Sequence, residues 1–322
     1  MRRRTSLTRR RTTKSSAGPS MRLCANSVPA TSSSVRLMPE GSAAKAGLVP
    51  GDIITKVDGA KVNGIAGIPG PEGTSVKLTV KRKSGETTDY TLTRKKFSTR
   101  RPEEITMVDD KTAKISVFSF DMSYDQDRIE TLLAKAKNKP YLILDLRDNG
   151  GGLVSNLQHM LSLFLPSDTP VGTMISKTTA RRFESETKGD GTDIFKVAEW
   201  SPRKLRPMMR PEGPLYSGKV AVLINGGSGS ASEMCAAALK ETIDAKVVGT
   251  KSAGAVLVSV ISPATNGFTL QYPLSDYVTI KGRRLEGNGV VPDVEAEESR
   301  LRLPGAPDDA VAKAVQALKA IL

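Results

Sequence analysis

The chain has 322 residues, of which 38% are apolar and 25% charged, enough for about two globular domains. No apolar run reaches the roughly 18 residues that a membrane-spanning helix needs, which excludes such a helix. Two cysteines, Cys24 and Cys235, exclude a disulfide framework, and a single histidine, His159, argues against a zinc site, so we expect no metal and no cofactor.

The net charge of +14 points to nucleic acid or an anionic membrane surface as a partner, but its placement weakens the first idea. The segment before Glu40 contains no acidic residue and supplies more than half of the excess. Residues 1–32, rich in serine and threonine, are typical of an organelle transit peptide; a disordered basic tail and a later start at Met21 are the alternatives. We therefore expect no nucleic-acid partner, while peripheral membrane association stays open.

Residues 33–97 predict a small, mainly β domain. In the clearest strand, Val76, Leu78 and Val80 alternate with polar residues, and Asp58-Gly59 is a hairpin signal. The predicted elements are a strand at Val35–Met38, a helix at Gly41–Leu48, and strands at Ile53–Val57, Ser75–Lys81 and Thr87–Leu92.

The basic stretch Arg94–Pro102 predicts a solvated connector, with residues 98–104 as the linker. Residues 105–322 predict an α/β domain with a largely parallel sheet, because buried strands alternate with helices. Its predicted strands are Lys114–Phe120, Tyr141–Leu146, Val220–Ile224, Lys246–Gly249, Thr269–Tyr272, Tyr277–Ile280 and one at Val290; its predicted helices are Gln126–Lys137, Ser155–Phe164, Ser230–Leu239 and Asp308–Leu322. We expect His159 at the surface or its boundary, and Cys235 in the core.

A glycine-rich junction, Asp145–Gly152, follows a buried strand and precedes a helix. In a parallel sheet this is the carboxyl edge, where ligands bind. Its glycines would let a substrate carbonyl approach backbone N–H groups closely, as an oxyanion hole requires. No Gly-Lys-Ser/Thr follows, so a phosphate-binding loop is unsupported; a plain tight turn is the structural alternative.

A second junction, Asn225–Glu233, also runs from a strand into a helix. A serine that begins a helix lies near free N–H groups and the positive end of the helix dipole, which favours a nucleophilic oxygen. Ser230 has this position. The structural alternative is a capping box of Ser230 with Glu233 three residues on, and the two roles are compatible.

Four stretches of the chain, in this order, resemble the C-terminal processing peptidases, which are tail-specific serine proteases with a PDZ domain. Together they reach over most of the sequence, and although each is only moderately specific, chance agreement of all four is very improbable. The stretches are Gly41–Asp52, Asp145–Gly152, Ser230–Glu233 and Leu285–Asp293.

The resemblance implies a PDZ-like module followed by an α/β peptidase domain of the ClpP/crotonase-like type. It implies Ser230 as the nucleophile, with the N–H groups of Gly152 and Ala231 as the oxyanion hole. The reaction would be hydrolysis of a peptide bond near the C-terminus of a protein substrate, through an acyl-enzyme. In the PDZ-like module, Leu48 and Gly51 would contact the peptide tail.

The sequence departs from the family at the general base. Most members carry a lysine on a glycine turn after the serine; ungapped alignment puts Ala255 there, and Ser259 where the family has glutamine. Three readings stay open. Lys251, earlier on the same turn, acts as the base; a carboxylate such as Glu286 or Glu233 takes part; or the chain is an inactive, PDZ-bearing scaffold that holds peptides without cutting them.

The PDZ-like module is also shortened. The stretch Asn63–Glu72 is rich in glycine and proline, which predicts that the second helix of a full PDZ domain is missing. Capture of a substrate tail by strand addition is therefore weakly supported. With the basic leader as a transit peptide, the resemblance implies a chloroplast, including its thylakoid lumen, or a mitochondrion as the location.

Overall fold

The computed structural model describes residues 33–34, 37, 41–49, 51–62, 67–82, 84–96, 101–264, 268–297 and 307–320. The chain divides into two compact units, residues 1–99 and 100–322. The predicted leader, Cys24 and most of the predicted strand Val35–Met38 lie outside the described residues.

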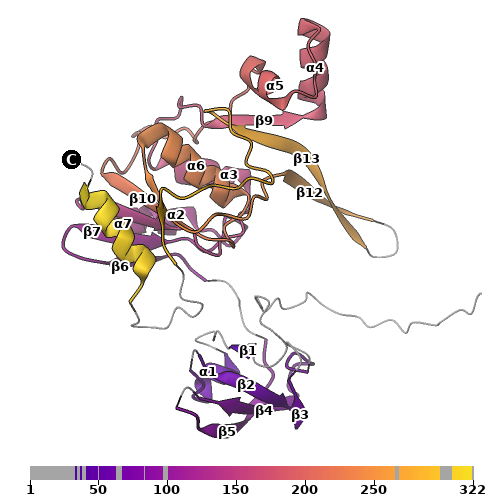
Figure 1. Ribbon diagram of the computed structural model, residues 1–322, viewed down its shortest axis with the longest axis vertical. Coiled ribbons are helices and arrows are strands. Elements are labelled where there is room, and N and C mark those ends of the chain that lie inside the picture. The colour runs from indigo at the N-terminus through magenta and orange to yellow at the C-terminus, as the bar shows by residue number, and fades with distance from the viewer. Residues whose placement is uncertain are drawn as a thin grey trace, which may run out of the picture. The chain divides into compact units, whose positions relative to one another are not determined.

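The described residues of the first unit form a small antiparallel sheet with one short helix (Figure 1). Apolar side chains from the alternating strand pattern form its core, including Val76, Leu78 and Val80, as predicted. At the predicted hairpin, Asp58 and Gly59 both have positive φ (49° and 81°), which a type I′ turn requires. The elements are β1 (Ser33–Ser34), α1 (Ser42–Lys45), β2 (Ile53–Val57), β3 (Ala60–Lys61), β4 (Ser75–Lys81) and β5 (Thr87–Thr93), with the strands paired in the order β1-β2-β4-β5 and β3 on β2.

The prediction that the basic stretch is a solvated connector from Arg94 onwards is wrong for Arg94 itself. Its guanidinium donates to the backbone oxygens of Gly67, Ile68 and Ser75, so it belongs to the first unit. The described part of the predicted helix-free segment, residues 67–72, forms turns and no helix.

The second unit contains a six-stranded sheet whose neighbours are parallel except at one edge (Figure 1). Its central strands are apolar on both faces because helices cover both. The strands, in spatial order, are β14 (Val294–Glu295), β11 (Lys246–Gly249), β10 (Lys219–Ile224), β8 (Tyr141–Asp145), β7 (Thr112–Ser116) and β6 (Glu104–Met107), and only β6 and β7 pair antiparallel.

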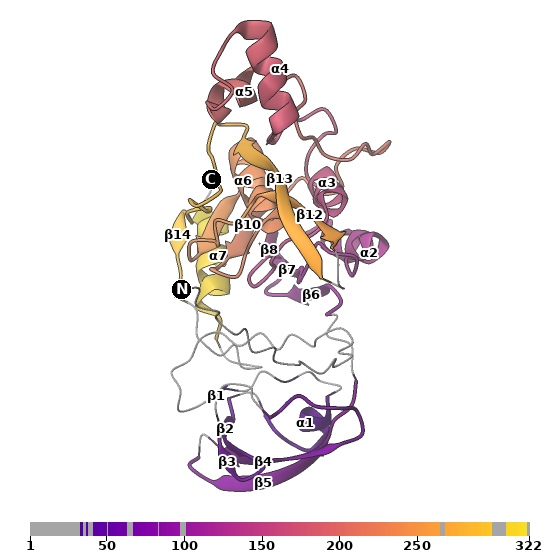
Figure 2. The ribbon, with the colours of Figure 1, turned by 90° about the vertical axis from the view of Figure 1, so that its right-hand side faces the viewer.

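Alternate residues of the central strands belong to two hydrophobic clusters, one on each face of the sheet. Leu142, Leu144 and Val222 pack with helices α2 (Gln126–Ala136), α3 (Val154–Ser162) and α6 (Ala231–Ile243). Their neighbours Ile143, Ala221 and Leu223 pack with α7 (Asp309–Ala320) on the other face. Figure 2 shows α7 on one side of the sheet and α2 and α3 on the other. The predicted α/β architecture is thereby confirmed.

A three-stranded antiparallel sheet, in the order β12-β13-β9, adjoins this core. The two strands that the sequence predicts at Thr269–Tyr272 and Tyr277–Ile280 are one long strand, β13. The sequence gives no prediction for its partner strands, β9 and β12, or for the two helices that follow β9. These elements are β9 (Gly172–Ser176), α4 (Lys177–Thr187), α5 (Ile194–Trp200), β12 (Val258–Pro263) and β13 (Thr269–Thr279).

The prediction that His159 lies at the surface or its boundary is wrong. Its side chain is 2% exposed, the Tyr124 hydroxyl lies 2.8 Å from its Nδ1, and a Glu130 oxygen lies 3.1 Å from its Nε2. These two hydrogen bonds explain how the polar ring of His159 can be buried. Cys235 is fully buried as predicted, and burial raises the pKa of its thiol to about 12. No helix within the described ranges is long and apolar enough to cross a membrane.

Candidate active site

Ser230 occupies a sharp turn between β10 and α6. Its backbone has φ 53° and ψ −119°, a region that residues with a side chain rarely adopt, at a cost of about 1–3 kcal/mol. The Ser230 N–H donates to the Ala255 oxygen (2.9 Å) and to Glu233 Oε2 (3.0 Å), which hold this conformation. The half-buried side chain therefore stands at the positive end of a 13-residue helix.

The glycine loop after β8 lies directly against this turn. A methyl group added at Gly151 would meet the Cβ of Ser230 at 2.6 Å and the nitrogen of Ala231 at 2.9 Å. Gly151 also has φ +96°, so both its space and its backbone require glycine. The Gly229 N–H donates to the Asn149 oxygen (3.0 Å), which joins the two loops by a backbone bond.

Gly152 and Ala231 each present a backbone N–H without an acceptor among the described residues. Ala231 is the first residue of α6. Gly152 forms a parallel bridge with Phe120, in which the C=O of Gly151 and the N–H of Leu153 carry the bonds. In this pattern the N–H of Gly152 itself faces away from Phe120 and stays available.

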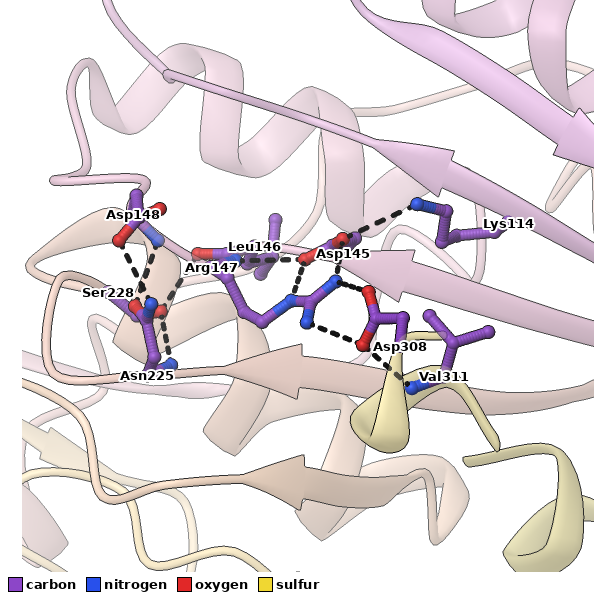
Figure 3. A network of polar contacts seen from close by, with 9 residues as sticks. All are labelled: Lys114, Asp145, Leu146, Arg147, Asp148, Asn225, Ser228, Asp308 and Val311. Atoms are coloured by element: carbon purple, nitrogen blue, oxygen red, sulfur yellow. Dashed lines mark hydrogen bonds and ion pairs between the residues drawn. The ribbon is translucent and has the colours of Figure 1, made fainter. Parts of the chain in front are cut away.

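Side chains fasten the two loops together (Figure 3). Asn225 Oδ1 accepts from the Asp148 N–H (2.9 Å), and Asn225 Nδ2 donates to Asp148 Oδ1 (2.9 Å). The buried Ser228 hydroxyl donates to the Leu146 oxygen (2.8 Å) and accepts from the Asn225 N–H (3.0 Å). Asn225 lies in the second glycine-rich junction, but its partner is 77 residues away, so no local pattern in the sequence indicates this contact.

Arg147 ties the same loop to the C-terminal helix (Figure 3). Its buried guanidinium donates to both oxygens of Asp145 and to both oxygens of Asp308, at 2.7–3.0 Å. Burial raises the pKa of the Asp308 carboxyl, but hydrogen bonds and charge from Arg147 outweigh it and hold that pKa below its usual value.

Two carboxylates bind the backbone of the turn at residues 254–257. Glu233 accepts from the N–H groups of Gly254 (2.7 Å) and Ala255 (2.9 Å). Glu286 Oε2 accepts from the next two N–H groups, those of Val256 (2.7 Å) and Leu257 (3.2 Å). The Ser230 N–H binds the same turn through the Ala255 oxygen. Glu286 and Ser230 therefore contact neighbouring residues of one turn, each through a backbone group of that turn.

The structure does not bring Lys251 to Ser230. Its exposed side chain lines a pocket of about 400 Å³ together with Lys240, Glu241 and Arg283, and Ser230 is not part of that wall. Among the described residues, no lysine, histidine or carboxylate side chain hydrogen-bonds to the Ser230 hydroxyl.

The two residues expected to contact a peptide tail lie in the first unit. Leu48 is 4% exposed and packs in the hydrophobic core of that unit. Gly51 has φ +97° at the turn before β2. Leu48 is thus a core residue of this unit.

The geometry around Ser230 fits acyl transfer. A hydroxyl that a strained backbone presents at a helix start can attack a carbonyl, and unpaired N–H groups of the two adjoining loops can bind the negative oxygen that forms. Within the described part of the chain, no group of three or more His, Cys, Asp or Glu side chains could hold a metal ion.

The sequence matches the model of peptidase family S41 over residues 111–296, more than half of the chain, and that of the PDZ domain over residues 34–82. A CtpA-like serine protease of Staphylococcus haemolyticus is 30% identical over 268 residues, or 80% of this chain and 48% of the relative. Its counterpart in Staphylococcus saprophyticus is 27% identical over 271 residues, or 81% of this chain and 50% of the relative. The chain thus spans about half the length of the curated relatives it matches.

Two solved structures are similar in fold. A photosystem II D1 C-terminal processing protease matches with a TM-score of 0.52 and 20% identity, over 88% of this chain and 71% of that one. An S41 protease of Bacteroides fragilis matches with a TM-score of 0.62 and 17% identity, over 88% of this chain and 77% of that one. The α/β fold with a PDZ domain, expected from the sequence, is confirmed.

Proposed function

The chain belongs to peptidase family S41, and from that premise we propose that it is a serine endopeptidase that cleaves protein chains near their C-termini. The observation that carries the proposal is the contact between two loops. Ser230, in a strained backbone at the start of α6, packs against Gly151, and the residues that follow these two, Ala231 and Gly152, have N–H groups without a partner among the described residues.

In the proposed reaction, the Ser230 hydroxyl attacks the scissile carbonyl carbon and its proton passes to a general base. The oxygen of the tetrahedral intermediate takes the negative charge and accepts hydrogen bonds from the N–H groups of Gly152 and Ala231. Each such donor is worth about 10²–10³ in rate. The amine then leaves with a proton, and water hydrolyses the acyl-enzyme.

The general base is proposed to be Lys251 or Glu286. Lys251 has a flexible side chain and no ion pair among the described residues. Its amine can therefore swing towards Ser230. Glu286 already binds the backbone of that turn through one oxygen, Oε2, and keeps Oε1 for a second role.

A serine-reactive fluorophosphonate tests the nucleophile. Wild-type protein should be labelled, and Ser230→Ala should not. Ser232→Ala is a matched control, because Ser232 lies two residues on in α6 and is fully buried, so its loss should leave labelling intact. Absence of labelling in wild type, or equal labelling of Ser230→Ala, would contradict the proposal.

Lys251→Ala and Glu286→Gln separate the two bases. Removal of the true base should lower the turnover of a peptide substrate by about 10²–10⁴, with the urea midpoint unchanged. Lys281→Ala, another exposed lysine, is the control and should keep full turnover. Full turnover in both test variants would discard both assignments.

Protein substrates with accessible C-terminal tails are the proposed partners. Support comes from the PDZ match and from the similar fold of a protease named for C-terminal processing of photosystem II D1. The basic residues 1–32, outside the described ranges, would direct the protein to a chloroplast or mitochondrion as a transit peptide and could also touch an anionic membrane.

One observation favours a second candidate function, an inactive peptide-holding scaffold. Ala255 stands at the position of the family's lysine, and no base among the described residues hydrogen-bonds to Ser230. The labelling experiment decides between them, because a scaffold would bind peptide tails yet show no labelling of Ser230.

A further inference from the structure

Glu233 is a carboxylate buried beside the nucleophile. It is 0% exposed and accepts four hydrogen bonds of 2.6–3.0 Å. No ion pair with Glu233 occurs among the described residues, so four neutral donors stabilise its position. The donors are the N–H groups of Ser230, Gly254 and Ala255 and the hydroxyl of Ser252.

These bonds close a ring around the nucleophile. Glu233 Oε2 accepts from both Ser230 N–H and Ala255 N–H, and the Ala255 oxygen accepts from the same Ser230 N–H. Through Oε1 it also holds Ser252, whose hydroxyl accepts from the Val290 N–H at 2.6 Å. One carboxylate thus connects the serine, the following turn and the 285–290 loop.

A capping role explains only one of the four bonds. In a capping box the glutamate accepts from the N–H of the first helix-flanking residue, here Ser230. The other three bonds go to Ser252, Gly254 and Ala255, which lie 19, 21 and 22 residues further along the chain. A helix cap does not need them.

We propose that Glu233 is a positioning residue, which holds the Ser230 backbone in its strained conformation and fixes the Ala255 turn against it. This inference rests on the proposed peptidase function. Because Glu233 has its lone pairs directed at four donors, it is not the general base. It acts on the reaction through the place of the Ser230 hydroxyl and of the neighbouring Ala231 N–H.

Glu233→Gln is the sharpest variant because it keeps the shape and removes one acceptor. Each carboxylate oxygen binds at least one backbone N–H, so a carboxamide turned either way leaves an N–H of Gly254, or those of Ser230 and Ala255, facing an NH₂ group. A displacement of about 1 Å at Ser230 is expected to slow labelling by a fluorophosphonate about 100-fold.

Glu241→Gln is the matched control. Glu241 lies on the same helix, is also buried, and likewise accepts from a hydroxyl, that of Thr279 (2.9 Å), and from a backbone N–H, that of Lys281 (3.0 Å). Glu241 also has an ion pair with the exposed Arg283 (3.6 Å), so its replacement should cost at least as much stability without touching the Ser230 turn. Glu241→Gln should therefore be labelled at the wild-type rate per folded molecule.

Two readouts on the full chain keep the inference separate from the proposed function. The first is the labelling rate, corrected for the folded fraction. The second, independent of activity, is amide hydrogen exchange in the peptide covering residues 250–257, which should speed up in Glu233→Gln and stay as in wild type in Glu241→Gln. Unchanged exchange in Glu233→Gln overturns the positioning role, even in a protein that labels. An unlabelled wild type overturns the peptidase function, while the exchange result still decides the role of Glu233.

Discussion

At the scale of single residues, two neighbouring glycines have different reasons to be glycine. Gly151 has positive φ, and a methyl group there would overlap with Ser230. Gly150 has no atom within 4 Å of the place where its Cβ would stand, and its φ lies outside the left-handed region. The pair therefore separates the need for close approach at Ser230 from the general need for a flexible loop.

Gly151→Ala should abolish labelling of Ser230, because the methyl would press on the Cβ of Ser230 and on the nitrogen of Ala231. Gly150→Ala should be labelled as wild type is. The labelling rate with a fluorophosphonate and the urea midpoint of both variants check this. Equal labelling of the two variants would show that the contact with Gly151 is not required.

The position of Ser230, the proposed nucleophile, follows from local patterns in the sequence, whereas the contacts that hold it in place do not. Ser230 follows a strand and begins a helix, and both features are local patterns. The contacts of Gly151 with Ser230 and of Ser252 with Glu233 join segments far apart in the chain, so no local pattern encodes them. The same holds for the burial of His159, which depends on two distant partners. Glu130 lies in helix α2, and Tyr124 lies in the loop before that helix.

At the scale of elements, the charged residue just before helix α7 joins this helix to the glycine loop, in addition to the apolar side chains that pack α7 on the sheet. Asp308 accepts from Arg147, which lies three residues before the glycine loop. It also accepts from the Val311 N–H (3.3 Å), as a helix cap does. The C-terminal helix is thus fastened to the loop that carries Gly151 and Gly152.

Asp308→Asn should lower the free energy of unfolding by about 2 kcal/mol, as expected for hydrogen bonds to a charged group. Asparagine keeps the capping oxygen, so the loss reports the charged contact with Arg147. Asp309→Asn is the control, because its surface pair with Lys313 is worth at most about 1 kcal/mol. Urea unfolding of both variants measures the difference, and equal midpoints would contradict the role of Asp308.

Elements with a strong apolar pattern were predicted well, and those that rely on tertiary packing were missed. Strands β8, β10 and β11 are nearly continuous apolar runs, and their predicted bounds differ from the observed ones by a residue at most. Helix α4 has a single buried side chain, Phe183, so its sequence lacks a stripe. Strand β12 is only half-buried and is defined by pairing with β13, which a sequence does not display.

At the scale of the whole molecule, overall stability at mildly acidic pH should depend on one residue. His159 is the chain's single histidine, and burial lowers its pKa, while hydrogen bonding to Glu130 acts in the opposite direction but is outweighed. Tyr124, Glu130, Arg210 and Asp127 are the titratable groups that face it. The folded chain therefore binds a proton at this ring less readily than the unfolded chain does.

The sign of the pH effect follows from that difference. Above about pH 6.5, the usual pKa of histidine, the ring is neutral in both the folded and the unfolded chain. The contribution of His159 to the free energy of unfolding is then at its full value. As the pH falls below that value, the unfolded chain takes up the proton first, so the free energy of unfolding decreases until the folded pKa is passed. Acidic side chains titrate at lower pH, since their usual pKa values are about 4. Urea midpoints between pH 7 and 5 should therefore fall in wild type and stay nearly level in His159→Gln, and parallel slopes would show that His159 has no part in the acid sensitivity.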